Sequence, residues 1–322
     1  MHGEAVKSWR IRLDRATVRL SLPHAPRLDR RWRRFITDDV QCADEGEQAD
    51  FELVTTEDPA PPMPEDVFAV EEMMASWSRE AIWVETPAGV LVGADDRYRL
   101  HVRPGLSGGA YEPTMALLGH VGARLGWNSL HSALVHSPAG ALLLIGQSGK
   151  GKSTSSAAAL QLGWSVDSDD VTFLRVEDGE VLAMGFPRVL SVPEVAVPDA
   201  LRQGPQPKLD HRLRRPVRDF ARIGGWHRIV AVIEVDHGLE DDTCVADLSP
   251  LDVIQGLVRN QAIAGSIPGE DRALATMLRM LATLPARRMA LGTDGANRTA
   301  STMAALVMLS DERATRALAV SG

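Results

Sequence analysis

One eight-residue segment, residues 146–153, has the composition and spacing of a loop that binds nucleotide phosphate. It reads Gly-Gln-Ser-Gly-Lys-Gly-Lys-Ser and fits the pattern G-x-x-x-x-G-K-[ST]. Glycines let successive backbone N–H groups turn inward around a phosphate, and a following helix presents its positive N-terminus to the same anion. We expect Lys152 to reach the β- and γ-phosphates and the Ser153 hydroxyl to ligate Mg²⁺. The residues predicted to bind the nucleotide are Gly146, Gln147, Ser148, Gly149, Lys150, Gly151, Lys152, Ser153 and Thr154.

An acidic pair, Asp169-Asp170, follows this segment after one expected helix and one short strand. Two neighbouring carboxylates beside a bound triphosphate can divide the work of phosphoryl transfer. One can hold the Mg²⁺ that bridges the phosphates, and the other can accept the proton of an attacking hydroxyl. The alternative interpretation is an acidic turn without chemistry. Because the pair comes so soon after the glycine-rich segment, we favour the interpretation as a phosphoryl-transfer site.

The flanking patterns predict the elements that position these groups. Residues 141–145 form a continuous apolar run typical of a buried strand, and residues 155–162 are rich in Ala and Leu, as a helix should be. Another apolar run, residues 132–136, comes earlier, and residues 137–140 between the two runs have the composition of a hairpin turn. The chain therefore enters the glycine-rich segment from a hairpin, whereas most P-loop enzymes enter theirs from a parallel sheet.

This arrangement resembles the catalytic core of HPr kinase/phosphorylase and its relatives and, more distantly, phosphoenolpyruvate carboxykinase. The resemblance covers residues 112–192 and rests on the hairpin, on the Asp-Asp pair after the loop's helix, and on His131 before the loop. It implies an α/β P-loop kinase core with ATP and Mg²⁺ as cofactors. By position, Asp169 would be the base toward a serine hydroxyl, Asp170 would hold the metal with Ser153, and His131 would lie close to the reacting phosphate. A hydrogen-bonded, purely structural His131 is the alternative.

The segment Phe186-Pro187-Arg188 is similar to one found in the looser HPr-kinase-like group, some members of which act in peptide natural-product pathways, including those of lasso peptides. The guanidinium of Arg188 is expected to steady the γ-phosphate, as its fixed fork suits phosphate oxygens. The basic stretch Lys208 to Arg222 is either a lid or clamp for the acceptor or a solvated surface loop. Kinases of this family are often oligomeric, so the resemblance also implies that this protein forms a homo-oligomer.

The pattern of the chain changes near residue 111. Before it, short alternating segments at residues 18–22, 81–84 and 89–92 indicate strands, and residues 56–64 have the composition of a linker. We therefore predict a small α+β module, residues 1–110, which either has a recognition role or packs on the core, and a catalytic domain, residues 111–322. A helix that starts at Glu112-Pro113 would open the catalytic domain.

The sequence further along the chain predicts the strands and helices that support the catalytic domain. Strands are predicted at residues 228–235 and 287–291, and a closing helix at residues 297–309. Apolar residues at helical spacing predict a core-facing helix between these strands, namely Leu274, Met277, Leu278 and Leu281.

Composition excludes several classes of function. The net charge of −8 argues against nucleic acid as the partner, since such proteins usually carry a strong basic footprint. Cys42 and Cys244 are too few and too isolated for a disulfide framework or a zinc site, and we interpret both as ordinary thiols. No apolar stretch approaches the ~20 residues that span a bilayer, and the N-terminus lacks the apolar region of a signal peptide. We expect a cytoplasmic protein without a membrane partner.

Two other functions remain open from the sequence. One is a small-molecule kinase of the nucleotide- or adenylylsulfate-kinase kind, which a parallel strand before the loop would favour over a hairpin. The other is a nucleotide-dependent switch that binds ATP or GTP without transferring phosphate. The chain has no Asn-Lys-x-Asp motif for guanine, so ATP is the expected nucleotide. The acceptor, whether peptide, protein or small molecule, is not specified by these patterns.

Overall fold

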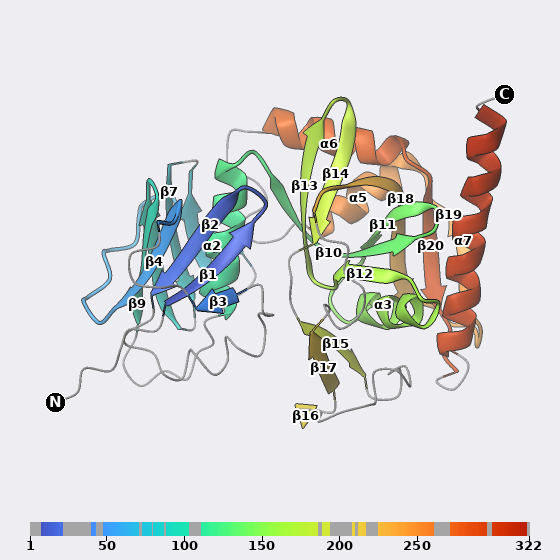
Figure 1. Ribbon diagram of the computed structural model, residues 1–322, viewed down its shortest axis with the longest axis horizontal. Coiled ribbons are helices and arrows are strands. Elements are labelled where there is room, and N and C mark those ends of the chain that lie inside the picture. Colours follow the sequence, from blue (N-terminus) through green and yellow to red (C-terminus); the bar gives the residue numbers. More distant parts are fainter. Residues whose placement is uncertain are drawn as a thin grey trace. The chain divides into compact units, whose positions relative to one another are not determined.

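The computed structural model shows a mixed α/β protein with two large sheets and few helices (Figure 1). It describes residues 8–21, 40–42, 48–70, 73–78, 80–86, 88–102, 111–185, 189–193, 208–209, 212–216, 225–260, 271–294 and 298–320. The contacts divide the chain into two compact units: the first comprises Met1–Asn128 and Ile263–Asp271, and the second comprises Ser129–Ala262 and Arg272–Gly322. Each unit is described by itself below.

The first unit is one nine-stranded sheet with a helix packed on it. Its strands run in the order β3-β1-β2-β4-β9-β8-β7-β6-β5, in which the pairs β2–β4 and β4–β9 are parallel. Its elements are β1 (Ser8–Leu13), β2 (Ala16–Ser21), β3 (Val40–Cys42), β4 (Phe51–Thr56), β5 (Phe68–Val70), β6 (Met73–Trp77), β7 (Ala81–Thr86), β8 (Gly89–Ala94), β9 (Arg97–Val102) and α2 (Tyr111–Arg124).

The alternating segments of the sequence form strands with one buried face. In β2 and β4 buried and partly buried residues alternate strictly, as the period of two predicts. Residues 56–64 connect β4 to β5 within this one sheet.

The predicted boundary at residue 110 differs from the observed one because of α2. Leu117 and Val121 of this helix are fully buried, as its helical stripe predicts. The helix packs on β7 and β8 and belongs to the first unit.

A buried histidine links α2 to the sheet of the first unit. His120 Nδ1 lies 2.9 Å from the Tyr98 hydroxyl, and His120 Nε2 lies 2.9 Å from the carbonyl oxygen of Ser78. A carbonyl can only accept, so Nε2 carries the proton and Nδ1 accepts from the tyrosine. Both rings are almost completely buried, and burial lowers the pKa of His120 and raises the pKa of Tyr98 to about 12.

This arrangement predicts that acid destabilises the first unit. Because the folded pKa of His120 lies below its unfolded value of about 6.5, the unfolded chain binds the extra proton first. The stability that neutral His120 contributes is therefore complete above that pH and is lost as the pH falls below it. Hydrogen exchange of peptides from α2 should accelerate between pH 7.5 and pH 5.5, after correction for intrinsic rates. The acceleration should be absent in His120→Gln and retained in His101→Gln, which changes a partly exposed histidine.

The second unit contains an eight-stranded sheet, a small three-stranded sheet and four helices among the described residues. Its elements are β10 (Asn128–Ser137), β11 (Gly140–Ile145), α3 (Lys152–Gln161), β12 (Ser165–Ser168), β13 (Val171–Glu177), β14 (Glu180–Gly185), β15 (Val189–Pro193), β16 (Lys208–Leu209), β17 (Arg212–Pro216), β18 (His227–His237), β19 (Cys244–Asp247), α5 (Pro250–Arg259), α6 (Asp271–Thr283), β20 (Ala286–Leu291) and α7 (Arg298–Val320).

Strands β10 and β11 form the predicted hairpin. They pair antiparallel from Ser132–Ile145 to Ser137–Gly140, and the turn lies where the sequence places it. On its other edge β11 pairs in parallel with β18, and β18 pairs in parallel with β20. The β11–β18 pairing closes the path β11-β10-β13-β14-β18 into a ring. The strand before the glycine-rich segment thus has one antiparallel and one parallel neighbour.

Strand β11 is apolar throughout because both of its faces are covered. Leu142 and Leu144 belong to a core with α3 and α7, whereas Leu143 and Ile145 belong to a core with α5 and α6. Figure 1 shows these helix pairs placed apart around the central strands of the unit. Every residue from Ala141 to Ile145 is at most 2% exposed, so β11 is a rigid base for the segment that follows it.

The remaining strands and helices predicted for this unit are confirmed, although the residues at which they begin and end differ. Strands β18 and β20 include the predicted strands, and α6 carries the predicted apolar stripe. The closing helix α7 extends to Val320, beyond the predicted end at residue 309. None of the described helices is long and apolar enough to cross a membrane.

Candidate functional site

The glycine-rich segment, called here the glycine loop (residues 146–153), joins the end of β11 to the start of α3. Gly146, Gly149 and Gly151 have φ angles of 149°, 83° and 105°. Side chains with a Cβ rarely adopt such angles, so the loop depends on glycine at these positions. Helix α3 begins directly after Gly151, which is left-handed, and no side chain caps its N-terminus.

Two of the three glycines also allow a close approach of the backbone to neighbouring strands. A Cβ at Gly146 would lie 2.4 Å from the carbonyl oxygen of Val235 in β18, and one at Gly151 would lie 2.1 Å from Leu291 Cδ1 in β20. A Cβ at Gly149 would meet nothing within 4 Å. The loop is therefore fixed to the sheet at both ends and open at its tip.

These differences predict unequal effects of alanine along the loop. Gly149→Ala should destabilise the protein by about 1 kcal/mol, because only the unfavourable φ is involved. Gly146→Ala adds a collision with backbone that cannot rotate away, so its cost should be at least about 3 kcal/mol. Chemical denaturation of the two variants checks the order. Equal effects would mean that the loop is not held against β18.

Lys152, the first residue of α3, is folded back into the glycine loop. Its side chain is 5% exposed, and Nζ donates to the carbonyl oxygens of Gly146 and, at 3.3 Å, of Gln147. A buried ammonium needs such partners because leaving water is costly. The positive charge is thereby held at the centre of the loop and close to the N-terminus of α3.

His131 connects Lys152 to the acidic pair. Its Nε2 lies 3.0 Å from Lys152 Nζ, and its Nδ1 lies 3.1 Å from Asp170 Oδ1 and 3.1 Å from the Asp170 carbonyl oxygen. A lysine ammonium can only donate, so Nε2 accepts and the proton of a neutral ring is on Nδ1, where it faces Asp170. His131 thus contacts both Lys152 and Asp170, and its predicted place close to the reacting phosphate stays a prediction.

The acidic pair lies at the end of β12, beside the start of α3. The Ser153 hydroxyl donates to Asp169 Oδ2 at 3.4 Å, and the Asp170 carbonyl oxygen accepts from the Ser132 N–H at 3.0 Å. Asp169 is 3% exposed, whereas the side chain of Asp170 is 17% exposed. The two carboxylates therefore differ in surroundings: Asp169 contacts the hydroxyl of the loop, and Asp170 contacts His131.

Two residues that no sequence motif indicates hold the tip of the glycine loop. Asp236 Oδ1 accepts from Lys150 Nζ at 2.7 Å, and His237 Nε2 lies 3.0 Å from the Gly149 carbonyl oxygen. Partial burial acts to raise the pKa of Asp236, but the bonds from Lys150 and from the His237 N–H outweigh it and lower that pKa. Both residues end β18, whose parallel pairing with β11 brings its carboxyl end to the loop.

The other predicted site residues are exposed, buried, or outside the residues that the structure describes. Gln147 and Ser148 are exposed at the tip of the loop, and Thr154 is buried in the first turn of α3. Arg188 lies outside the described residues. The basic stretch is described only in part, as β16 and β17, where β17 pairs with β15.

The open N-terminus of α3 contrasts with that of α5. In α5, Ser249 and Asp252 cap the helix reciprocally and Pro250 occupies its start. In α3 neither a capping side chain nor an acidic residue is present in the first turn. Its N–H groups and dipole are therefore available to an anion.

Comparisons with known proteins add little to this geometry. No family model matches the chain, and no curated protein matches it. A solved structure of the HPr(Ser) kinase/phosphatase from Coxiella burnetii is similar to 57% of this chain and 98% of that chain, with 14% identity and a TM-score of 0.30. At this TM-score the likeness is distant and decides neither the fold nor the activity.

Proposed function

We propose that this protein is an ATP-dependent kinase that transfers the γ-phosphate to a hydroxyl, preferably of a serine, in a peptide, protein or small-molecule acceptor. The observation that carries the proposal is the contact between the Ser153 hydroxyl and the Asp169 carboxylate. It joins the end of the glycine loop to an acidic pair, in which one carboxylate can hold Mg²⁺ with Ser153 and the second remains for the proton of an acceptor hydroxyl. Lys152 and His131 continue the same set of contacts to Asp170.

In this proposal phosphate oxygens replace the carbonyl oxygens that Lys152 contacts in the glycine loop. The N–H groups of the loop and the N-terminus of α3 would hold the β- and γ-phosphates, and Lys152 Nζ would exchange the carbonyl oxygens of Gly146 and Gln147 for phosphate oxygens. The exchange replaces neutral acceptors of the ammonium by charged ones, which bind it more strongly. The backbone of Lys152 remains in the first turn of α3 while its side chain changes partners.

The contacts favour a division of labour opposite to the one that the family resemblance implies. Ser153 and Asp169 offer adjacent hard oxygen ligands, which suit Mg²⁺. The metal would neutralise the charge of the β- and γ-phosphates. Asp170 is more exposed and is held by His131, so it is better placed to accept the proton of an incoming hydroxyl. We therefore assign the metal to Ser153 and Asp169 and the base to Asp170.

The hairpin that precedes the loop favours this class of kinase over a small-molecule kinase of the nucleotide- or adenylylsulfate-kinase kind, whereas the parallel pairing of β11 with β18 is compatible with both. The partly exposed Asp170 favours a phosphotransferase over a switch, since a switch requires no base for an acceptor. The acceptor is proposed by chemistry alone, as a hydroxyl that can reach Asp170.

The experiment is a transfer assay with γ-labelled ATP and Mg²⁺. Candidate acceptors are serine-containing peptides, including peptides that end near a serine, and small hydroxyl compounds. The proposal predicts label on a hydroxyl of an acceptor with wild-type protein and none with Lys152→Met. Release of labelled phosphate alone, unchanged by every acceptor, would indicate a nucleotide switch and contradict the kinase.

A further inference from the structure

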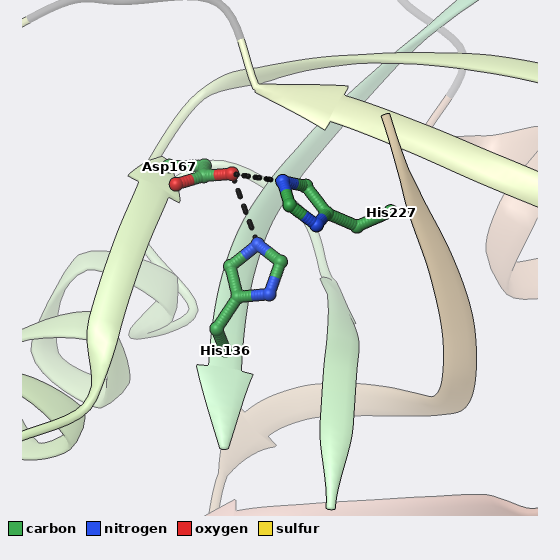
Figure 2. A group of neighbouring side chains, drawn as sticks. All are labelled: His136, Asp167 and His227. Carbon is green, nitrogen blue, oxygen red and sulfur yellow. Dashed lines mark hydrogen bonds and ion pairs between the residues drawn. The ribbon is translucent and has the colours of Figure 1, made fainter. Parts of the chain in front are cut away.

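A second cluster of chemically active side chains lies toward the start of β11, at the end of that strand opposite the glycine loop. His136 Nε2 lies 2.9 Å from Asp167 Oδ2, and His227 Nε2 lies 3.6 Å from the same oxygen. One ligand atom from each residue lies within 4.8 Å of the other two. Figure 2 shows both imidazole rings directed at one carboxylate.

The carboxylate at the centre of this cluster is almost fully removed from water. The side chains of Asp167 and His136 are 1% and 8% exposed, and that of His227 is 22% exposed. A buried carboxylate is retained where cationic or hydrogen-bonding partners compensate for its lost hydration. Two imidazoles and a carboxylate form a donor set that a divalent transition metal can also satisfy.

The separations fit a tetrahedral metal site. Ligands at the 2.0–2.1 Å typical of Zn–N and Zn–O bonds are about 3.3 Å apart in a tetrahedron. The two distances to Asp167 Oδ2, 2.9 and 3.6 Å, lie on either side of this value. The ligand atoms of the two imidazoles lie within 4.8 Å of each other, so rotation of the rings can bring the third separation to the same value.

The backbone holds the three residues in place. His136 lies on β10, Asp167 on β12 and His227 at the start of β18 (Figure 2). The register of β10 and β12 shifts between Leu134 and Val135, opposite the segment that contains Asp167. Gly185 of β14 lies against Asp167, and a Cβ there would come within 2.5 Å of the Asp167 carbonyl group. Ligands mounted on strands in this way are already oriented before a metal arrives.

We propose that His136, Asp167 and His227 form a binding site for one divalent transition metal, best suited to Zn²⁺, separate from the Mg²⁺ site proposed at the glycine loop. Nitrogen ligands disfavour Mg²⁺, which prefers oxygen, so the two sites select different ions. The partial exposure of His227 leaves a side from which the metal can enter and a water can complete the coordination. The alternative is a metal-free cluster, in which His136 bonds to Asp167 and the two rings pack edge to face at 4.2 Å.

A metal at this site would fix the end of β12. Asp167 lies two residues before Asp169 and three before Asp170, so the metal would anchor the strand that presents the acidic pair. Because the metal binds the folded chain, it should also stabilise the second unit. This proposal does not depend on the kinase, since its test measures metal binding and not activity.

Titration of full-length, chelator-treated protein with Co²⁺ tests the site, because the visible bands of Co²⁺ report nitrogen and oxygen ligands in tetrahedral geometry. Millimolar Mg²⁺ is present throughout to occupy oxygen sites. We expect one equivalent of coloured Co²⁺ that Zn²⁺ displaces. His136→Gln and His227→Gln should each weaken binding at least about a hundredfold. His101→Gln and Asp170→Asn should leave it unchanged.

Thermal unfolding gives a second measurement on folded protein. Excess Zn²⁺ should raise the melting temperature of the wild type by roughly 5 °C and leave that of His227→Gln unchanged. His227 is the most exposed of the three residues, so this variant is the one best expected to fold. Absence of coloured Co²⁺, or full binding in the double variant His136→Gln/His227→Gln, would overturn the proposal. Loss of binding in Asp170→Asn would place the metal at the acidic pair instead and would equally overturn it.

Discussion

Replacing Lys152 by alanine is expected to reduce kcat for phosphoryl transfer by about a hundredfold to a thousandfold. The reason is that Lys152 is the buried cation at the centre of the glycine loop, and charge placed in advance where the transition state needs it is worth several kcal/mol. Lys152→Met, which keeps the apolar stem, should lose as much activity. Steady-state assays with a peptide acceptor, beside a thermal melt of each variant, measure the effect.

The glycine loop supplies its own control for this experiment. Lys150, two residues earlier, is 37% exposed and forms an ion pair with the 44% exposed Asp236. Exposed ion pairs contribute little, so Lys150→Ala should change kcat by less than about fivefold. If Lys150→Ala and Lys152→Ala lose activity equally, the effect belongs to loop structure or net charge and the special role of Lys152 is wrong.

The second large effect is a separation of functions within the acidic pair. Asp169→Asn removes the carboxylate that contacts Ser153, so the Mg²⁺ concentration that gives half-maximal activity should rise at least about tenfold. Asp170→Asn removes the partly exposed carboxylate held by His131. It should bind Mg·ATP normally and lose at least about a hundredfold in kcat, the range of general-base catalysis. Titration of activity with Mg²⁺ and equilibrium binding of Mg·ATP distinguish the two variants.

The opposite pattern would restore the roles that the family resemblance implies. In that case Asp170→Asn would need more Mg²⁺, and Asp169→Asn would bind Mg·ATP and fail to transfer phosphate. Wild-type behaviour in both variants would reduce the pair to an acidic turn.

Local elements of this fold could be predicted where the pattern is itself local. The apolar runs at residues 132–136 and 141–145, with turn residues between them, determine the hairpin. Helix α3 follows from Ala and Leu after the last glycine, and the alternation in β2 and β4 follows from their one buried face. In each case a periodicity or a turn residue decides the structure without distant partners.

What an element packs against could not be predicted in the same way. The apolar stripe of α2 shows that one face is buried, but the stripe is the same whether the sheet lies before or after it in the chain. The helix was therefore assigned to the following domain, whereas it packs on β7 and β8. Hydrophobic periodicity specifies a buried face and not its partner.

The missed parts of the two sites have the same cause. Asp236 and His237 reach the glycine loop only because β18 pairs in parallel with β11. His136 and His227 are 91 positions apart, and Asp167 lies on a third strand, so no fixed spacing marks the cluster. One signal was present: polar residues at the end of an apolar strand, as in β18, often lie where parallel sheets bind ligands.

Hydrogen exchange with and without Mg·ATP tests the central claim most directly, because it locates the bound nucleotide along the chain. The glycine loop and the acidic pair form one phosphate site in this account, so peptides covering residues 146–154 and 165–171 should be protected by Mg·ATP. Peptides from the sheet of the first unit should be unchanged, and Lys152→Met should lose most of the protection. Protection confined to another part of the chain, or none at saturating Mg·ATP, would contradict the assignment of the nucleotide site to this loop.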